Sequence, residues 1–372
     1  MPRHDVLFLA AGAAAAVVVT LAVRRQQQKK KRTKVLVIGG AGAIGKRLIA
    51  ELVKRNGPGS VIAGLRNTPL PPPLDSQVIC EYGVDVRKEE TLAKLFAKHG
   101  DSVEVVWNLA APLSVDTAAD PKAAHDTVVG GMEKILRCMA SAGVRRICFS
   151  DSIGSFGSEA PRAAASASWL VRNPTQDPGS DYGRQKRACR ELMAAFSKSH
   201  GFDTRWCVIP GVLHSDETWG GGTTEYALDA ILSASRGGST GGGSTGGGSS
   251  ITPFGCIVPL DAQLPMILAD DLIEGMLRLM SAPRAQLTQP EAGYALAGFS
   301  FSGNQLCALL QKRCPGFTAV EALDPAAAAF AGLWPDSLSG VEAKVDLGFE
   351  AGNGFEATVD RILQAHRTRA GR

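Results

Sequence analysis

The chain has 372 residues, of which 45% are hydrophobic and 20% are charged, and its net charge is +4. This length and composition indicate a globular protein with one or two domains and a large core. The first 34 residues hold eight basic residues against one acidic residue and carry +7, which leaves −3 on the remainder. A mildly acidic body has no electrostatic footprint for nucleic acid, so we predict no nucleic-acid partner.

The cysteines and histidines give no sign of a disulfide framework or a metal site. The eight cysteines contain no Cys-x-x-Cys pair, and several lie in apolar runs such as residues 146–149. We therefore predict reduced thiols that act as small buried apolar residues. The six histidines have no metal-ligand spacing, and we predict no metal.

An apolar segment occupies the N-terminal end of the chain. Residues 6–23 form an 18-residue apolar run, and Arg24, Arg25 and the basic run 29–34 follow it. The run is just long enough to span a bilayer, and its basic flank predicts that the body stays on the cytoplasmic side. We predict that residues 1–34 are a membrane anchor with a basic linker. An organelle-targeting presequence, such as a mitochondrial one, and a cleaved secretory signal are the alternatives.

A glycine-rich turn lies between the first expected strand and the first expected helix. The apolar run 35–38 leads directly into glycines at positions 39, 40, 42 and 45, and residues 46–53 have a helical pattern. This order aims backbone N–H groups and the positive end of the helix dipole at a pyrophosphate. We therefore predict a dinucleotide site, with a plain glycine turn as the alternative. Its residues are Gly39 for the tight turn, Gly42 for close approach to the phosphates, Gly45 for helix packing, and Ala43 and Ile44 between them.

The following residues alternate between strand and helix patterns, as a doubly wound sheet requires. The expected strands are 60–65, 77–81, 103–110, 144–149 and 203–209, and the expected helices are 89–99, 123–142 and 182–198. We predict an α/β fold in which residues 35–210 form a dinucleotide-binding domain around a parallel sheet of the Rossmann type.

The regular alternation ends after residue 210. Residues 211–372 are expected to form a smaller α/β substrate lobe, with a helix at 224–235 and a strand at 251–258. A strand at 265–268 and a helix at 270–280 are expected to return to the Rossmann domain near 264–280. Residues 236–250 are mostly Gly, Ser and Thr, so we predict a flexible insertion.

Two positions after expected strands indicate how the adenosine end of a cofactor would be bound. The place where an acidic residue usually binds the ribose hydroxyls of NAD holds Gly64-Leu65-Arg66. Arg66 is suited to a 2′-phosphate, or it is an ordinary solvated turn residue. Asp85 and Val86 are placed to contact the adenine ring, although Asp85 is equally placed to cap the next helix. We predict NAD or NADP as the cofactor.

A phenol and an ammonium lie four residues apart at the start of the helix expected at 182–198. Tyr182 and Lys186 therefore share one face of that helix. A tyrosine that acts as a general base needs its phenolate form, and a lysine charge nearby stabilises that form. Ser152 follows the strand expected at 144–149, and ligands bind at the carboxyl ends of such strands. We predict that Ser152 binds the substrate oxygen; a cap for the following turn is the alternative.

These motifs together resemble those of the extended short-chain dehydrogenases/reductases of the NAD-dependent epimerase/dehydratase superfamily, and Asn108-Leu109-Ala110-Ala111 adds to the likeness. Within that superfamily the chain is most similar to the short-chain-type L-threonine 3-dehydrogenases, over about residues 35–365. The segments that carry this likeness are 220–227, Leu264-Pro265-Met266, Gly298-Phe299-Ser300-Phe301, Trp334-Pro335-Asp336-Ser337 and Asp346-Leu347-Gly348-Phe349.

The resemblance implies oxidation of the L-threonine hydroxyl to 2-amino-3-oxobutanoate with hydride transfer to NAD(P), and usually a homodimer. In that reading Tyr182 takes the hydroxyl proton, Lys186 supports the phenolate and holds the ribose, and Ser152 orients the oxygen. The remaining implied contacts to the cofactor are Leu109, Ala110, Ala111 and Ile209, and those to the small-molecule substrate are Ser114, Gly222 and Thr223.

Three positions depart from the family pattern. Leu65 stands where the family has the Asp that selects NAD, and Val128 stands where an Asn is usual in a proton relay. Residues 116–118 read Asp-Thr-Ala where Gly-Glu is usual. A nucleotide-sugar epimerase or dehydratase, or another NADP-dependent reductase on the same scaffold, is therefore an alternative function. A cofactor-binding protein with little catalysis is a further alternative.

Overall fold

The computed structural model describes residues 33–216, 222–236 and 253–370. The expected membrane or targeting segment at 6–23 and residues 237–250 of the expected insertion lie outside these ranges. Within the described residues, no helix combines the length and the apolar character that crossing a bilayer requires.

A seven-stranded parallel sheet forms the centre of the molecule, in the order β10-β6-β5-β4-β1-β2-β3. The chain builds outward from β1 to β3 on one side and then from β4 on the other, so the order reverses between β1 and β4. A ligand crevice is expected at that reversal, outside the carboxyl ends of the strands. The prediction of a doubly wound sheet is confirmed. The strands are β1 Lys34–Ile38, β2 Val61–Gly64, β3 Ile79–Glu81, β4 Val103–Asn108, β5 Arg146–Ser152, β6 Asp203–Ile209 and β10 Gly293–Ala295.

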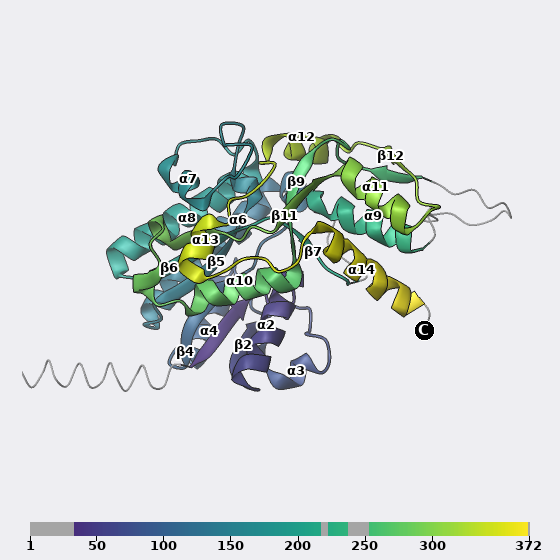
Figure 1. Cartoon of the computed structure of the whole chain (residues 1–372). Coiled ribbons are helices and arrows are strands. Elements are labelled where there is room, and N and C mark those ends of the chain that lie inside the picture. The colour runs from purple at the N-terminus through teal and green to yellow at the C-terminus, as the bar shows by residue number, and fades with distance from the viewer. Residues whose placement is uncertain (1–32, 217–221, 237–252, 371–372) are drawn as a thin grey trace, which may run out of the picture.

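Helices cover both faces of this sheet (Figure 1). Successive residues of a strand point to opposite faces, and in β1 Leu36 packs into one apolar cluster whereas Val37 packs into the other. The cluster around Leu36 contains residues of α4 Glu89–His99, α6 Pro121–Ser141 and α8 Asp181–His200. The cluster around Val37 contains residues of α2 Ala43–Asn56, α10 Ala269–Ser281 and α13 Val341–Leu347.

Two small sheets and several helices form a second region beside the large sheet (Figure 1). A three-stranded sheet has the order β11-β9-β7, and a two-stranded sheet pairs β12 with β8. The strands are β7 Gly211–Leu213, β8 Phe254–Cys256, β9 Gln263–Leu268, β11 Phe299–Ser302 and β12 Ala319–Glu321. The helices are α9 Tyr226–Ser235, α11 Gly303–Arg313, α12 Pro325–Leu333 and α14 Phe355–Ala370. The shorter helices α3 Leu74–Gln77, α5 Ser114–Ala119 and α7 Ala167–Arg172 lie in connections of the first region.

Several element boundaries differ from those expected. β5 continues to Ser152, three residues beyond the expected end, because its last residues still pair with β6. β3 begins only at Ile79, since the preceding residues close the short helix α3. Within the described residues, the strand expected at 251–258 is limited to β8. All eight cysteines are free; five of them are buried as predicted, whereas Cys80, Cys307 and Cys314 are only partly buried.

Candidate active site

The glycine turn after β1 has the backbone that the sequence predicts. Gly39 has a φ of +82°, and a Cβ there would lie 2.8 Å from the backbone nitrogen of Ala110, so only glycine fits this turn. A Cβ on Gly45 would lie 2.5 Å from the carbonyl oxygen of Gly39. Gly45 therefore allows α2 to pack against the turn, as expected. It lines neither of the two cavities described below, so it supports the cofactor site through this packing and not through a contact of its own.

The N-terminus of α2 is suited to an anion. Gly42 is the N-cap, no side chain caps the helix, and its first turn contains no acidic residue. The first backbone N–H groups of a helix have no partners within the helix and carry the positive end of its dipole. The free N–H groups and the lack of acidic residues at this end of α2 therefore suit the negative charge of a pyrophosphate.

A cavity of about 540 Å³ lies at the carboxyl ends of β1, β2 and β4. It brings together residues that are far apart in the sequence and that we predicted as cofactor contacts. These are Gly39, Gly42, Arg66, Asp85, Val86, Leu109, Ala110 and Ala111. The cavity therefore combines the glycine turn with the ends of three strands, which is the arrangement expected for a dinucleotide.

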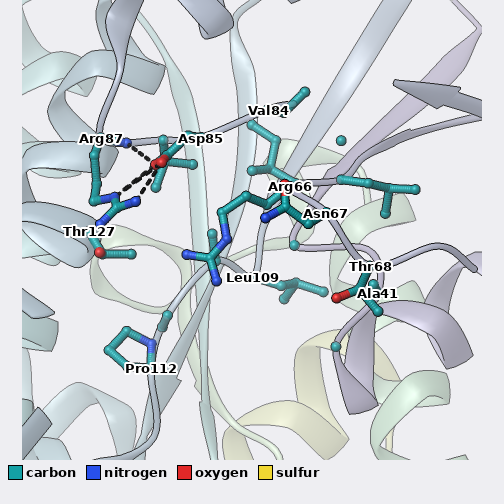
Figure 2. Close-up of a pocket in the computed structure, with 18 of the residues that line it drawn as sticks. Ala41, Arg66, Asn67, Thr68, Val84, Asp85, Arg87, Leu109, Pro112 and Thr127 are labelled. Atoms are coloured by element: carbon teal, nitrogen blue, oxygen red, sulfur yellow. Dashed lines mark hydrogen bonds and ion pairs between the residues drawn. The ribbon is translucent and has the colours of Figure 1, made fainter. Parts of the chain in front are cut away.

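Arg66 is the cationic side chain at the centre of this cavity. Figure 2 shows it reaching into the middle, with Asp85 and Arg87 on one side and Ala41 and Thr68 on the other. The preceding Leu65 is 1% exposed and belongs to the apolar cluster under the turn. In the part of the chain that the structure describes, the Arg66 guanidinium makes no hydrogen bond or ion pair, so its charge is available to a ligand.

Asp85 is held by the neighbouring Arg87 (Figure 2). The Arg87 guanidinium donates to both carboxylate oxygens, at 3.0 Å from Nε to Oδ1 and 2.6 Å from Nη2 to Oδ2. These hydrogen bonds lower the pKa of Asp85 to about 2, so the group is ionised at neutral pH. The alternative prediction that Asp85 caps the next helix is wrong, because the N-cap of α4 is Lys88 and no side chain caps it.

A second, smaller cavity of about 180 Å³ adjoins the first at the start of α2. It too collects residues predicted from distant segments, namely Ala43 and Ile44 after the glycine turn, Ser114, Tyr182, Lys186, Ile209, Gly222 and Thr223. Residues expected to contact the cofactor and residues expected to contact the substrate therefore share one space, as hydride transfer between the two would require.

Tyr182 and Lys186 lie on the first two turns of α8, which begins after the capping residue Ser180. Lys186 is 3% exposed, and its Nζ donates a 2.8 Å hydrogen bond to the carbonyl oxygen of Ser150. The same Nζ lies 5.4 Å from the centroid of the Tyr182 ring. One hydrogen bond to β5 thus holds a buried ammonium beside the phenol ring.

Ser152 ends β5 close to the Tyr182 ring. Its Oγ accepts a 3.1 Å hydrogen bond from the backbone nitrogen of Gly154, so the alternative prediction of a turn cap is confirmed. A Cβ on Gly154 would lie 2.8 Å from Cδ1 of Tyr182 and 3.6 Å from Oγ of Ser152, so both side chains flank this glycine. Ser152 itself is not among the residues that line the cavity, whereas Asp151 and Ile153 are.

Ser114 and Thr223 meet in the wall of the smaller cavity. Their hydroxyl oxygens lie 3.4 Å apart, and both residues are buried. Ser114 begins α5, and Thr223 begins a short 3₁₀ turn that leads into α9. Gly222 donates its backbone N–H to the Glu225 carboxylate, which closes this turn. The two hydroxyls provide hydrogen-bonding capacity for a polar ligand.

Trp334 and His214 also line the smaller cavity and were not predicted as site residues. Trp334 is 4% exposed, and its indole N–H makes no hydrogen bond within the described part of the chain. The Arg162 guanidinium holds its segment by donating to the carbonyl oxygen of Trp334. The sequence did mark Trp334-Pro335-Asp336-Ser337 as a family segment, and that match was the signal that could have placed Trp334 in the site.

The parallel sheet, the glycine turn and the two adjoining cavities define an enzyme of the Rossmann class that uses a dinucleotide cofactor. The NAD dependent epimerase/dehydratase family matches residues 35–291, which is more than half of the chain. The chain therefore belongs to this family. The predictions of the family, of the fold and of an NAD(P)-dependent enzyme are confirmed.

Three relatives illustrate the similarity. The mitochondrial L-threonine 3-dehydrogenase of Bos taurus is 26% identical over 339 residues, which cover 90% of this chain and 82% of the bovine one. An uncharacterised epimerase/dehydratase of Staphylococcus haemolyticus is 26% identical over 335 residues, covering 89% and 97%. The holo form of the GalE-like L-threonine dehydrogenase from Cupriavidus necator superposes with a TM-score of 0.76 at 28% identity, covering 89% and 99%.

Proposed function

We propose that the protein oxidises the 3-hydroxyl of L-threonine to 2-amino-3-oxobutanoate, with hydride transfer to NAD(P). The observation that carries this proposal is the smaller cavity, in which the phenol of Tyr182 and the ammonium of Lys186 face the same space as Ser114, Thr223 and Trp334. A proton acceptor and several hydrogen-bond donors thus surround a volume that adjoins the cofactor cavity. The similarity to two L-threonine dehydrogenases supports the choice of substrate.

The cofactor fits the residues that are present. The open N-terminus of α2 would receive the pyrophosphate, and residues at the ends of β2, β3 and β4 would enclose the adenosine part. The nicotinamide part would lie near Ile44 and Ile209, which line the smaller cavity. When bound, the oxidised cofactor supplies the acceptor for the hydride that leaves the carbon bearing the hydroxyl.

The protein's own residues handle the proton and hold the amino acid. Tyr182 takes the hydroxyl proton as its phenolate, which the nearby Lys186 charge stabilises. Ser152 Oγ accepts the Gly154 N–H with one of its two lone pairs, and its own O–H is free to donate to the substrate oxygen. The hydroxyls of Ser114 and Thr223, together with the indole N–H of Trp334, would bind the carboxylate and amino groups.

The volume of the smaller cavity favours an amino acid over a nucleotide sugar. Sites for larger ligands usually enclose about 300–1,000 Å³, whereas the described residues enclose about 180 Å³ here. A nucleotide sugar would need space for a base, two phosphates and two sugar rings beyond the cofactor. The alternative of an epimerase or dehydratase on the same scaffold is therefore less well supported.

We also propose that NADP is preferred to NAD. The position after β2 that usually carries an acidic residue for the ribose hydroxyls holds the buried Leu65. The next side chain, Arg66, presents an unpaired guanidinium to the cavity, which suits a 2′-phosphate. Because no carboxylate is present, NAD loses a hydrogen bond between its ribose and a charged group, which weakens its binding by about 1.5–3 kcal/mol.

The test is the reduction of NAD and of NADP by the full chain with L-threonine, L-serine and other 3-hydroxy acids, each beside the Tyr182→Phe variant. We expect turnover with L-threonine, faster with NADP, and a loss of turnover in Tyr182→Phe. Turnover of UDP- or dTDP-sugars instead would establish the alternative function. Equal background rates for wild type and variant with every 3-hydroxy acid would refute the dehydrogenase proposal.

Two further predictions concern assembly and location. We propose a homodimer, as is usual for this superfamily, and light scattering on the purified chain would test it. We propose that residues 6–23 anchor the protein to a membrane or direct it to mitochondria; the mitochondrial name of the bovine relative supports the second possibility. Fractionation of cells that express the full chain and a chain lacking residues 1–32 would decide between them.

A further inference from the structure

A buried ion pair lies next to the proposed catalytic residues. Asp151, the next-to-last residue of β5, is 1% exposed, and Arg190 of α8 is 5% exposed. The Arg190 guanidinium donates from Nη1 to the Oδ2 carboxylate oxygen of Asp151. Neither residue was predicted from the sequence, and the proposed reaction does not use either of them.

The second carboxylate oxygen of Asp151 holds the turn that carries Ser152. Asp151 Oδ1 accepts a 2.9 Å hydrogen bond from the backbone nitrogen of Ser152 and a 2.5 Å hydrogen bond from Oγ of Ser155. The carbonyl oxygen of Ser155 in turn accepts a 2.7 Å hydrogen bond from the Gln176 side chain. The carboxylate therefore fixes the backbone on both sides of Ser152, at the point where the strand turns toward the cavity.

Arg190 lies on the helix face that carries the proposed base. Tyr182, Lys186 and Arg190 are four residues apart, so they occupy successive turns of one face of α8. The Arg190 guanidinium also lies 5.1 Å from the centroid of the Trp206 ring, and Trp206 belongs to the neighbouring strand β6. Together with the hydrogen bond from Lys186 to Ser150, the pair ties α8 to the end of β5 at two consecutive turns.

A gain in folding stability does not explain why Asp151 and Arg190 form a buried ion pair. Removing two charges from water is costly, and well-packed apolar residues of similar volume are often at least as stabilising. What charged groups add is direction, because each hydrogen bond fixes an angle as well as a distance. Here the directions fixed are those of Ser152 on β5 and of the face of α8 that carries Tyr182.

We propose that Asp151 and Arg190 are positioning residues that hold Ser152 and Tyr182 in register toward the same substrate oxygen. This inference rests on the proposed dehydrogenase function. It predicts that loosening the pair lowers the rate of the chemical step, while binding of the adenosine part of the cofactor in the larger cavity stays intact. A misplacement of about 1 Å in an active site is enough to cost roughly 100-fold in rate.

The test compares the full chain with Arg190→Met, Arg190→Lys, Asp151→Asn and the double variant Asp151→Asn/Arg190→Met. The matched control is Arg205→Met, because Arg205 is also a buried arginine paired with an aspartate, but at the opposite end of β6. We expect Arg190→Met and Asp151→Asn to lower kcat per folded molecule by about 10- to 100-fold. Their KM for the cofactor is expected to stay within about twofold, Arg190→Lys to recover part of the rate, and the double variant to be no worse than the poorer single one.

Several outcomes would overturn the proposal. If Arg190→Met lowers only the melting temperature and keeps the wild-type kcat per folded molecule, as we expect of Arg205→Met, the pair is merely structural. Fully additive losses in the double variant would likewise show that the two residues do not act as a unit. A loss confined to the cofactor KM would place their role in cofactor binding.

A second measurement separates this proposal from the proposed function, because it needs no turnover. Backbone hydrogen exchange of residues 150–156, followed by mass spectrometry, reports how firmly Asp151 holds the turn that carries Ser152. We expect faster exchange there in Arg190→Met and unchanged exchange in Arg205→Met. If the wild type turns over no 3-hydroxy acid, the proposed function fails, and unchanged exchange in Arg190→Met would then refute the positioning role as well.

Discussion

The two adjoining cavities hold their polar side chains in different ways. In the larger cavity the deciding groups are at the surface: Arg66 extends from the end of β2 and is held by no partner in the described chain. In the smaller cavity the deciding groups are buried and fixed, as Lys186 is by Ser150 and Ser114 is by Thr223. Under the proposed function, cofactor choice therefore depends on a single exposed side chain, whereas catalysis depends on a network of buried side chains.

The largest effect is expected at Lys186, the buried ammonium beside the Tyr182 ring. Lys186→Met keeps the length of the side chain but removes the ammonium beside the Tyr182 ring, so the phenolate loses its stabilising charge. We expect kcat to fall by about 10²- to 10⁴-fold in steady-state assays, the range typical of a general-base contribution. Lys198→Met, in the last turn of the same helix, is the matched control and should keep its activity. Comparable rates in the two variants would show that catalysis does not depend on the buried Lys186 ammonium.

A stability effect of intermediate size is expected at His214 in the wall of the smaller cavity. Burial, followed by the Arg47 charge, lowers the pKa of His214 to about 4, against about 6.5 when the chain is unfolded. Between these values the unfolded chain binds a proton that the native chain excludes. The free energy of unfolding should therefore fall as the pH decreases from about 6.5 toward 4, by up to about 3 kcal/mol from this residue.

The His214→Asn variant isolates this contribution. The His214 Nδ1 accepts a hydrogen bond from the backbone nitrogen of Asp216 at 3.3 Å, and the asparagine oxygen can replace that acceptor. Urea unfolding near pH 7 and near pH 4.5 should show a loss on acidification that is about 2.5 kcal/mol smaller in the variant than in the wild type. If wild type and variant lost the same free energy of unfolding on acidification, His214 would be accessible to water and protons in the native protein. The side chains of the smaller cavity would then be no more buried than those of the larger one.

A smaller effect, on selectivity alone, is expected at Arg66 in the larger cavity. Arg66→Ala removes the charge offered to a 2′-phosphate and should weaken NADPH binding by about 10- to 150-fold, which corresponds to roughly 1.5–3 kcal/mol. NADH binding and the melting temperature should change little, because the side chain is exposed and unpaired. Fluorescence titration with both cofactors measures this, with Arg137→Ala on the exposed surface of α6 as the control. A wild type that binds NADH more tightly than NADPH would show that Arg66 is an ordinary turn residue.

The local parts of this architecture were predictable because local rules determine them. The glycine turn, the pairing of Tyr182 with Lys186 and most elements of the large sheet follow from spacing and hydrophobic pattern. Strand β10 was missed because three residues are too few to show a pattern, and it is the neighbouring β6 that makes them a strand. The extension of β5 to Ser152 likewise depends on pairing with β6 rather than on its own residues.

The buried network was not predictable for a related reason. Asp151 and Arg190 are 39 positions apart, and each is an ordinary polar residue in its local context. Only the packing of α8 against β5 makes them partners. The same holds for Trp334, whose indole reaches the site because Arg162 holds its segment from 172 positions away. Side chains that act through tertiary contacts carry no local signal, whereas the exposed Arg66 could be identified by its offset from the glycines.

An effect no larger than that at Arg66, and confined to substrate binding, is expected at Trp334, and it tests whether the buried network extends to the substrate. Trp334→Phe keeps most of the aromatic surface, including the stacking on Phe330 at 5.9 Å between ring centroids, and removes only the indole N–H. If that N–H binds the substrate carboxylate, the KM for L-threonine should rise by up to about 10- to 150-fold, the worth of one hydrogen bond to a charged group, with kcat nearly unchanged. Phe330→Leu, which loosens the stacking but keeps the N–H, is the matched control. A fall in kcat at constant KM in Trp334→Phe would instead assign the tryptophan to the alignment of the reacting groups.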